Sequence, residues 1–350
     1  MHYTIMSIRR TSPVSLIFHT EYLIIMNLSI FELAYLGSQA KDTPHSGQNQ
    51  ILRYGKARIV PETTDDLWMR QLGLLPEPDR PLARLLLESE AETTKKELQD
   101  THSYSLLLAQ PVHLSLQRDS FALDGQLALS AEEYSALTNH LNNFFAEDGI
   151  TLIPSARQQY WFFKTASPLQ LTTQPVQAVL YQNIQAWMPQ GPDANKLRQI
   201  INQVQMLLHE HPLNQKRVQL GLPEINSIWF SGNSFCGQAY TIAPVQNTVL
   251  IGQNALTHLI SEICQLPHYA DLSTAAAAGA KDMVVLIDKA DSTLWDEIYQ
   301  AVRSRNVQQM MAHFPAVNST LRVSLTPLDC WKFWRKPNSF ELTFKALSRS

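Results

Sequence analysis

Apolar and polar residues alternate along the segment 109–116. Val112, Leu114 and Leu116 are separated by polar neighbours, and this period of two is typical of a β-strand with one buried face. The segment is therefore predicted to be a strand of a sheet that covers a core on one side.

The dipeptide Asp124-Gly125 stands between two short apolar runs, 121–123 and 127–129. Because Asp and Gly accept the positive φ angles of a tight turn, this spacing predicts a β-hairpin. Further apolar and aromatic runs predict strands at 152–153 and 160–163.

A helix is predicted to follow the hairpin. Ser130 and Glu133 have the spacing of a capping box, in which the hydroxyl and the carboxylate satisfy free amides of the first turn. Asp148-Gly149 is a termination signal. The apolar face of this helix consists of Tyr134, Leu137, Leu141 and Phe144. The whole segment 110–165 indicates an antiparallel α+β unit.

In the second half of the chain, helical and strand patterns alternate. Asp193 is predicted to cap a helix that Pro212 ends. The buried stripe of that helix is Leu197, Ile200, Ile201, Val204 and Leu208. Strands are predicted near 225–230, 248–251, 283–287 and 321–324, with helices near 255–264 and 293–303. Such alternation is typical of a parallel sheet with helices on both faces.

The predicted fold class is α/β, with a parallel or mixed sheet between helices on both faces and an antiparallel α+β subdomain. The expected division is an extension at 1–25, an N-terminal α/β part at 26–109, the α+β subdomain at 110–192 and a second α/β part at 193–350. The extension lacks the roughly 20 apolar residues of a membrane span and a cleavage site. We expect it to be dispensable, with Met26 as an alternative start.

Composition narrows the class of protein and its partners. With 28 Lys and Arg against 31 Asp and Glu, the net charge of −3 gives no overall attraction for nucleic acid or an anionic membrane. Cys236, Cys264 and Cys330 are far apart and odd in number, which argues against a disulfide framework and a Cys-x-x-Cys metal site. We expect a cytoplasmic protein that binds neither membrane nor nucleic acid and carries no cofactor.

Polar residues with ligand chemistry are densest at 205–217. His209, Glu210 and His211 could be taken for metal ligands, but residues i and i+2 point about 200° apart on a helix, so one ion cannot easily take both imidazoles. A helix C-terminus, where the helix dipole favours His, is the alternative.

The amide and guanidinium groups of Asn214, Arg217 and Asn226 suit an anion or a carbonyl-bearing ligand. Alternatively, these side chains satisfy the backbone of the segment that joins helix and strand. Gly232 begins the run Gly-Asn-Ser after the strand predicted to end at Phe230, where ligands bind in open α/β sheets.

Two further groups of residues allow two interpretations each. Asp288 and Asp291 follow a predicted strand, as catalytic carboxylates often do, yet Asp291 also suits a helix N-cap. The run 331–336 interleaves aromatic and basic residues like a surface for single-stranded nucleic acid. Docking of the C-terminal segment through its two tryptophans is the interpretation we favour.

Four segments, 205–232, 110–119, 144–149 and 331–336, together resemble the RpfE-type regulatory proteins of Gram-negative bacteria, over roughly residues 27–340. Members of this family are often labelled cofactor-independent phosphoglycerate mutases. The run from His211 to Gly232 is also similar to the archaeal-type mutases of the alkaline phosphatase superfamily.

The resemblance to these mutases implies two metal ions held by Asp and His clusters, and a Ser nucleophile near the N-terminus. One cluster has the pattern Asp-x-x-Gly-His after the strand equivalent to 283–287. This chain has Asp-Lys-Ala-Asp-Ser-Thr from Asp288 onwards, without Gly-His. Two-metal phosphoryl transfer needs the ligands that fix the ions and polarise the phosphate.

We therefore expect a regulatory or ligand-sensing protein that is a catalytically degenerate relative of these mutases. The alternative is an active 2,3-bisphosphoglycerate-independent phosphoglycerate mutase or a phosphatase. The expected partner is a small phosphorylated or anionic ligand, or a protein. The ligand-binding candidates are His209, His211, Asn214, Arg217, Asn226 and Gly232, and no residue is assigned to catalysis or to a metal.

Overall fold

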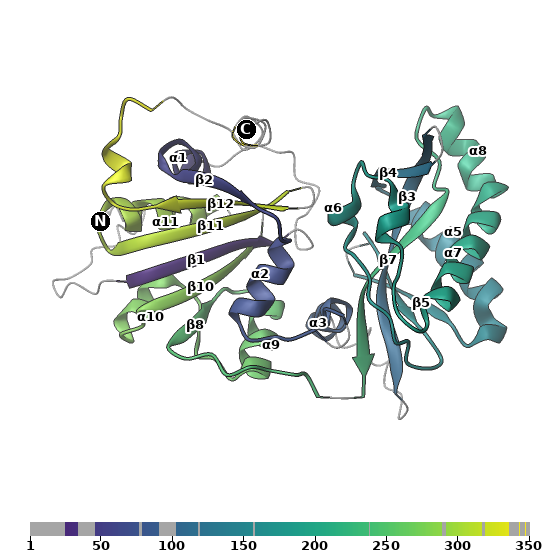
Figure 1. Ribbon diagram of the computed structural model, residues 1–350, viewed down its shortest axis with the longest axis horizontal. Coiled ribbons are helices and arrows are strands. Elements are labelled where there is room, and N and C mark those ends of the chain that lie inside the picture. Colours follow the sequence, from purple (N-terminus) through teal and green to yellow (C-terminus); the bar gives the residue numbers. More distant parts are fainter. Residues whose placement is uncertain are drawn as a thin grey trace, which may run out of the picture.

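The computed structural model describes residues 25–33, 46–76, 79–90, 103–117, 120–156, 158–237, 239–288, 292–316, 319–335, 343 and 347. These residues form two bodies, each built on its own β-sheet, which lie side by side (Figure 1).

The sheet of the first body is mixed. Its strand order is β2-β12-β11-β1-β10-β8-β9, and the run from β11 through β1, β10 and β8 to β9 is parallel. The strand β12 is antiparallel to β11, and β2 is antiparallel to β12. The strands are β1 (Ile25–Leu33), β2 (Lys56–Val60), β8 (Thr248–Ile251), β9 (His268–Tyr269), β10 (Asp282–Asp288), β11 (Val307–Ala316) and β12 (Ser319–Leu325).

Helices cover both faces of this sheet. On one face lie α1 (Ser46–Tyr54), α10 (Leu272–Ala277) and α11 (Ser292–Arg303), whose apolar residues share a core with the sheet. On the other face lie α2 (Thr64–Gln71), α3 (Leu82–Ser89) and α9 (Ala255–Cys264). A short 3-10 helix, η3 (Asp329–Trp331), follows β12.

The sheet of the second body is antiparallel. Its long central strand β3 (Tyr104–Gln117) pairs with β4, β6 and β7, and β5 pairs with β6. The other strands are β4 (Ser120–Gln126), β5 (Thr151–Pro154), β6 (Trp161–Lys164) and β7 (Ser227–Cys236). The helical elements are α5 (Ala131–Phe145), η1 (Ala146–Asp148), α6 (Val176–Val179), η2 (Ile184–Trp187), α7 (Ala194–His209) and α8 (Pro212–Gln219). The helices α5 and α7 share a core with the outer face of the sheet (Figure 1).

One hydrophobic core is common to both bodies. Leu85 and Leu86 of α3 belong to it together with Leu106 and Leu108 of β3 and Ile260 of α9. The helix α3 packs against β3 and β7 on one side and against α9 on the other. The two sheets are thus joined by buried apolar contacts as well as by the chain.

The predicted fold class, a mixed α/β sheet with an additional antiparallel α+β unit, is confirmed. The capping box is also confirmed, since the amide of Glu133 donates to Ser130 Oγ at 3.2 Å and the amide of Ser130 donates to Glu133 Oε2 at 2.8 Å. Gly149 adopts a left-handed conformation, with φ of 66°, after this helix.

Two local predictions were wrong, and a third is confirmed only in position. The strand expected at 225–230 belongs to the antiparallel sheet and continues as β7 to Cys236. Asp124-Gly125 forms no turn but lies within β4, opposite a register shift in β3. Asp193 occupies the N-cap of α7, but its carboxylate accepts from the amide of Gln170 instead of a helix amide.

The expected N-terminal extension lies outside the described residues except at its end. Ile25 is the first residue of β1 and pairs with Val307 of β11. Within the part of the chain that the structure describes, no helix has the length and apolar character of a membrane span.

Candidate functional site

Four of the six residues that the sequence marks as ligand-binding candidates, His209, His211, Asn214 and Arg217, lie at the corner between α7, α8 and β7. His209 is exposed at the last position of α7. His211 is the N-cap of α8, where its Nδ1 accepts from the amide of Leu213 at 3.2 Å. Its ring packs edge-on against His140 at 4.7 Å between centroids, and burial, followed by the charge of His140, lowers its pKa. His211 thus has a structural role as a helix cap.

Asn214 ties three segments of this corner together. Its side-chain amide donates to the carbonyls of Leu208 and Ile225, both at 2.8 Å, and its Oδ1 accepts from the amide of Ile225 at 2.8 Å. All these groups are buried, and a buried polar group without a partner would be costly. The side chain therefore replaces backbone pairing between the end of α7 and the start of β7.

Arg217 is buried, with 3% of its surface exposed. Its Nε donates to the carbonyl of Pro223 at 2.8 Å, and its guanidinium donates to Glu133 Oε1 at 2.9 Å. Because Glu133 also belongs to the capping box of α5, Arg217 fixes α8 against the N-terminus of α5.

Asn226 and Gly232 lie apart from Asn214 and Arg217. The side chain of Asn226 accepts from the amide of Leu114 at 2.7 Å and donates to the carbonyl of Leu114 at 2.8 Å, next to the register shift in β3. Gly232 lies within β7 with φ of +67°, and its amide donates to Thr173 Oγ1 at 2.9 Å. The expectation of a ligand site at the end of a strand at Phe230 does not fit, since β7 runs on through Gly232.

A surface groove of about 580 Å³ lies beside these residues. Its lining residues are Leu114, Phe121, Asn202, Gln205, Met206, His209, Glu210 and Asn226. Of the six predicted ligand-binding residues, the groove brings together only His209 and Asn226. Binding at this corner stays a prediction.

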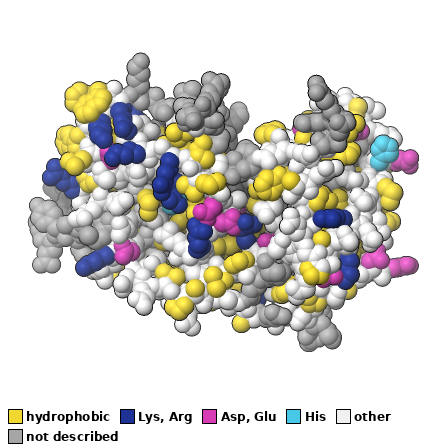
Figure 2. All heavy atoms as spheres, in the orientation of Figure 1, with side chains coloured by type: hydrophobic (Ala, Val, Ile, Leu, Met, Phe, Trp, Pro, Cys, Tyr) yellow, Lys and Arg dark blue, Asp and Glu magenta, His cyan; other side chains and the backbone are white. Residues whose placement is uncertain are grey.

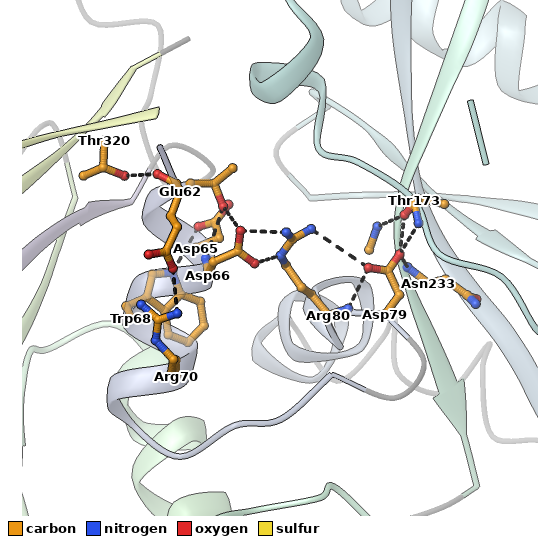
Figure 3. Close-up of polar contacts among 12 residues, drawn as sticks. Glu62, Asp65, Asp66, Trp68, Arg70, Asp79, Arg80, Thr173, Asn233 and Thr320 are labelled. Carbon is orange, nitrogen blue, oxygen red and sulfur yellow. Dashed lines mark hydrogen bonds and ion pairs between the residues drawn. The ribbon is translucent and has the colours of Figure 1, made fainter. Parts of the chain in front are cut away.

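A second polar cluster, which we call the polar junction, connects the two bodies (Figure 3). Arg80 forms an ion pair with Asp66 of α2 and lies 4.0 Å from Asp79 Oδ1. Asp79 Oδ2 accepts from the amide and hydroxyl of Thr173, with an amide distance of 2.8 Å, and from the amide of Asn233 at 3.3 Å. The junction therefore links a helix of the first body to buried backbone of the second.

Burial sets the electrostatics of the polar junction. Asp79 is 5% exposed, and burial raises the pKa of its carboxyl from 3.8 to about 6 against the opposing hydrogen bonds from Thr173, Arg80 and Asn233. Asp65, also buried, accepts from the indole of Trp68 at 3.0 Å, and burial raises its pKa as well. Figure 2 shows acidic side chains beside Lys and Arg side chains between the two bodies.

The polar junction was missed at the sequence level. Asp79 and Arg80 stand between Pro78 and Pro81, and this is the one local signal that marks the segment as a rigid turn. Nothing in the sequence shows that their partners are Asp66, 13 positions before Asp79, and Thr173, 94 positions after it.

The carboxyl ends of the parallel strands are only partly described. β10 ends at Asp288 and lies between β1 and β8, but Asp291 and the segment 34–45 lie outside the described residues. Among the described residues, no group of three or more His, Cys, Asp or Glu side chains is arranged to hold a metal ion.

Comparisons with known proteins give short or distant similarities. No family model matches the chain. Over 58 residues, 17% of this chain, the sequence is 38% identical to a 2,3-bisphosphoglycerate-independent phosphoglycerate mutase of Methanothrix thermoacetophila, and the match spans 15% of that protein.

Two solved structures align with most of the chain at low similarity. A cofactor-independent phosphoglycerate mutase from Thermoplasma acidophilum is 13% identical, with 87% of this chain and 89% of that chain covered and a TM-score of 0.32. A protein from Pyrococcus horikoshii is 12% identical, with 87% and 88% covered and a TM-score of 0.32.

Proposed function

We propose that this chain is a regulatory or ligand-sensing protein of the RpfE type, a relative of the metal-dependent phosphoglycerate mutases whose catalytic site has degenerated. The end of β10 carries the proposal. This strand lies in the parallel part of the first sheet, between β1 and β8. In the mutases that the sequence resembles, the equivalent strand leads into Asp-x-x-Gly-His, whereas here Asp288 is followed by Lys-Ala-Asp-Ser.

The chemistry of the mutase reaction explains why this difference matters. Two metal ions must be fixed and must polarise the transferred phosphate, and imidazole and carboxylate groups supply that coordination. Asp291 and Ser292 stand in place of Gly-His, and neither offers an imidazole there. The 58-residue match to a phosphoglycerate mutase supports the lineage.

The corner between α7 and β7 also supports the proposal. The segment that most resembles the mutases contains Asn214 and Arg217, and both side chains are occupied by hydrogen bonds within the chain. These contacts give the segment a role in the fold. Such a role is consistent with a protein that keeps the fold of an enzyme without its reaction.

An activity assay tests the proposal. Purified full-length protein with added manganese should interconvert 2- and 3-phosphoglycerate no faster than buffer, with an active archaeal-type mutase as the positive control. Turnover that Asp288→Asn abolishes would contradict the proposal and favour the alternative, an active 2,3-bisphosphoglycerate-independent phosphoglycerate mutase or a phosphatase.

A further inference from the structure

Four side chains form a row across the first sheet on the face that α2 partly covers. Phe31 of β1 is paired with His313 of β11, His313 with Arg322 of β12, and Arg322 with Arg58 of β2. Directly paired residues point to the same face of a sheet, with Cβ atoms roughly 5 Å apart. We call His313, Arg322 and Arg58 the basic row.

Two buried nitrogens of the basic row, Arg322 Nε and His313 Nδ1, have no hydrogen-bond partner among the described residues. The Nε atom of Arg322 is buried, and Arg58 is exposed with no hydrogen bond or ion pair to the part of the chain that the structure describes. His313 is 2% exposed and its Nδ1 has no partner in the described part of the chain. Buried polar groups in native proteins are normally paired, so an unpaired one is available to hydrogen-bond a ligand.

The ring of His313 is held in place by its neighbours. It stacks on Phe31 at 4.2 Å between centroids and 13° between planes, and it makes a hydrogen bond with the backbone of Ile30. Burial, followed by the charges of Arg322 and Arg58, lowers the pKa of His313 to about 3. The imidazole is therefore neutral near pH 7, and the nitrogen left without a partner is an acceptor.

Positive charge exceeds negative charge around the row. Arg58 and Arg70 both lower the pKa of Arg322, after burial, while Glu62 raises it. Glu62 is already paired with Arg70 at 2.6 Å. Three guanidinium groups against one carboxylate leave a net charge of +2. Neighbouring like charges destabilise the folded chain unless an anion lies between them.

We infer that the basic row binds a small phosphate-bearing anion that also offers a hydroxyl group. Guanidinium groups hold phosphate oxygens through directional, charge-assisted hydrogen bonds. Arg322 and Arg58 hold the anionic oxygens, and His313 Nδ1 accepts a hydrogen bond that the hydroxyl group donates. This inference rests on the proposed ligand-sensing function and names its site and ligand class.

Two inorganic anions test the roles of the row separately. Hydrogenphosphate carries a hydroxyl, whereas sulfate is an anion of similar size without one. Calorimetric titration of the full-length protein at pH 7 should show tighter binding of phosphate than of sulfate. Arg322→Gln should weaken both by roughly tenfold or more. Arg303→Gln, an exposed arginine at the end of α11, is the matched control and should bind as wild type.

His313→Phe retains an aromatic ring against Phe31 but removes the acceptor. It should lower phosphate affinity to the level of sulfate and leave sulfate affinity unchanged. No phosphate binding by wild type, or unchanged binding by the double variant Arg58→Gln and Arg322→Gln, would overturn the inference.

Stability distinguishes a binding role from a structural one. Without added anion, Arg322→Gln should have a thermal midpoint equal to or above that of wild type. The change removes a like charge, and Nε donates no hydrogen bond to the described residues that would offset this charge. A lower midpoint together with unchanged phosphate binding would show that Arg322 serves packing instead. The phosphoglycerate assay and the titrations test different claims. Turnover in the assay would contradict the regulatory role, whereas the titrations decide whether the basic row binds an anion.

Discussion

The guanidinium of Arg217 is buried between α8, the loop before β7 and the start of α5. Arg217→Ala should lower the free energy of unfolding by about 1–3 kcal/mol, because the carbonyl of Pro223 and the carboxylate of Glu133 lose their donor. Urea denaturation measures this loss. Lys216→Ala, at the exposed neighbouring position, is the control, and equal losses in the two variants would contradict the structural role.

The carboxyl of Asp79 should make stability depend on pH. Its pKa is raised from 3.8 to about 6 in the folded chain, so folding favours the protonated form. The stability it contributes is complete below about pH 4 and is lost as the pH rises through 6, by up to roughly 3 kcal/mol.

Asp79→Asn removes this titration. The difference in unfolding free energy, variant minus wild type, should therefore be larger at pH 7.5 than at pH 4.5. This holds even if the substitution also changes stability by an amount that does not depend on pH. Urea denaturation at several pH values measures the trend, with Asp148→Asn at an exposed position as the control. A pH-independent difference for Asp79→Asn would show that the carboxyl titrates normally.

For single residues, the sequence predicted a side-chain interaction correctly where both partners lie within one turn of a helix. Ser130 and Glu133 are three positions apart, and their mutual capping is a local property. For Asn214, Arg217 and Asn226 two interpretations were open, and the hydrogen bonds favour the structural one. The partners Glu133 and Leu114 are 84 and 112 positions away, beyond the reach of local patterns.

Among the elements, the packing of α3 on β7 depends on a glycine. Gly232 and Gly221 both have positive φ, +67° and +69°, so replacement by Ala costs about 1 kcal/mol of backbone strain at either position. A Cβ at Gly232 would lie 3.2 Å from Leu82 Cβ of α3 and 3.3 Å from the amide of Ala83, whereas one at Gly221 meets nothing within 4 Å.

Gly232→Ala should therefore destabilise the protein more than Gly221→Ala does. The difference between the two losses in unfolding free energy measures the contact with α3 alone. Thermal denaturation of both variants gives the comparison, and losses of the same size would mean that α3 moves aside at no cost.

Two elements show the limits of local patterns. Pro212 ends α7 as predicted, but it is also the first residue of α8, a helix in the segment where the sequence predicts only a connection between helix and strand. A proline suits the first turn of a helix, so one residue carries both signals. The tryptophans at the C-terminal end, Trp331 and Trp334, are 61% and 68% exposed, so docking through them was wrong.

The C-terminal segment is held by arginines instead. Arg335 donates to the carbonyls of Tyr54 and Gly55 at 2.7 and 2.9 Å, and Arg53 donates to the carbonyls of Arg335 and Phe333. In an alternation of aromatic and basic residues, either type can face the rest of the protein. Here the carbonyls at the end of α1 accept from Arg335, so a basic residue faces inward.

In the whole molecule, the shared core should make the two bodies unfold together. Leu86 of α3 lies in that core and is 2% exposed. Leu86→Ala should lower the free energy of unfolding by about 2–5 kcal/mol and keep a single transition. Far-UV circular dichroism and tryptophan fluorescence should give the same lowered midpoint. Two separated transitions would show that each body has an independent core.

The sequence predicted the class of fold, but it did not predict which strands belong to which sheet. Alternation of strands and helices predicted a doubly covered sheet, which β8, β10 and their helices form. The pattern of β7 is equally compatible with either sheet, and only pairing with β3 places it. The domain boundaries at 110 and 193 stay predictions, and this pairing favours a further one after Cys236.

Tyr104 and Cys236, the first and last residues of the antiparallel sheet, are paired with each other. Paired Cα atoms lie about 5 Å apart, so the chain leaves the first body and returns to it at nearly one point. Every strand of the first sheet that the structure describes lies before residue 61 or after residue 247. The antiparallel body is thus an insertion, which a single genetic event could add or remove without changing any strand pairing of the first sheet. Its removal would, however, leave α3 with one apolar side uncovered, so such an event would also select for polar residues on that helix.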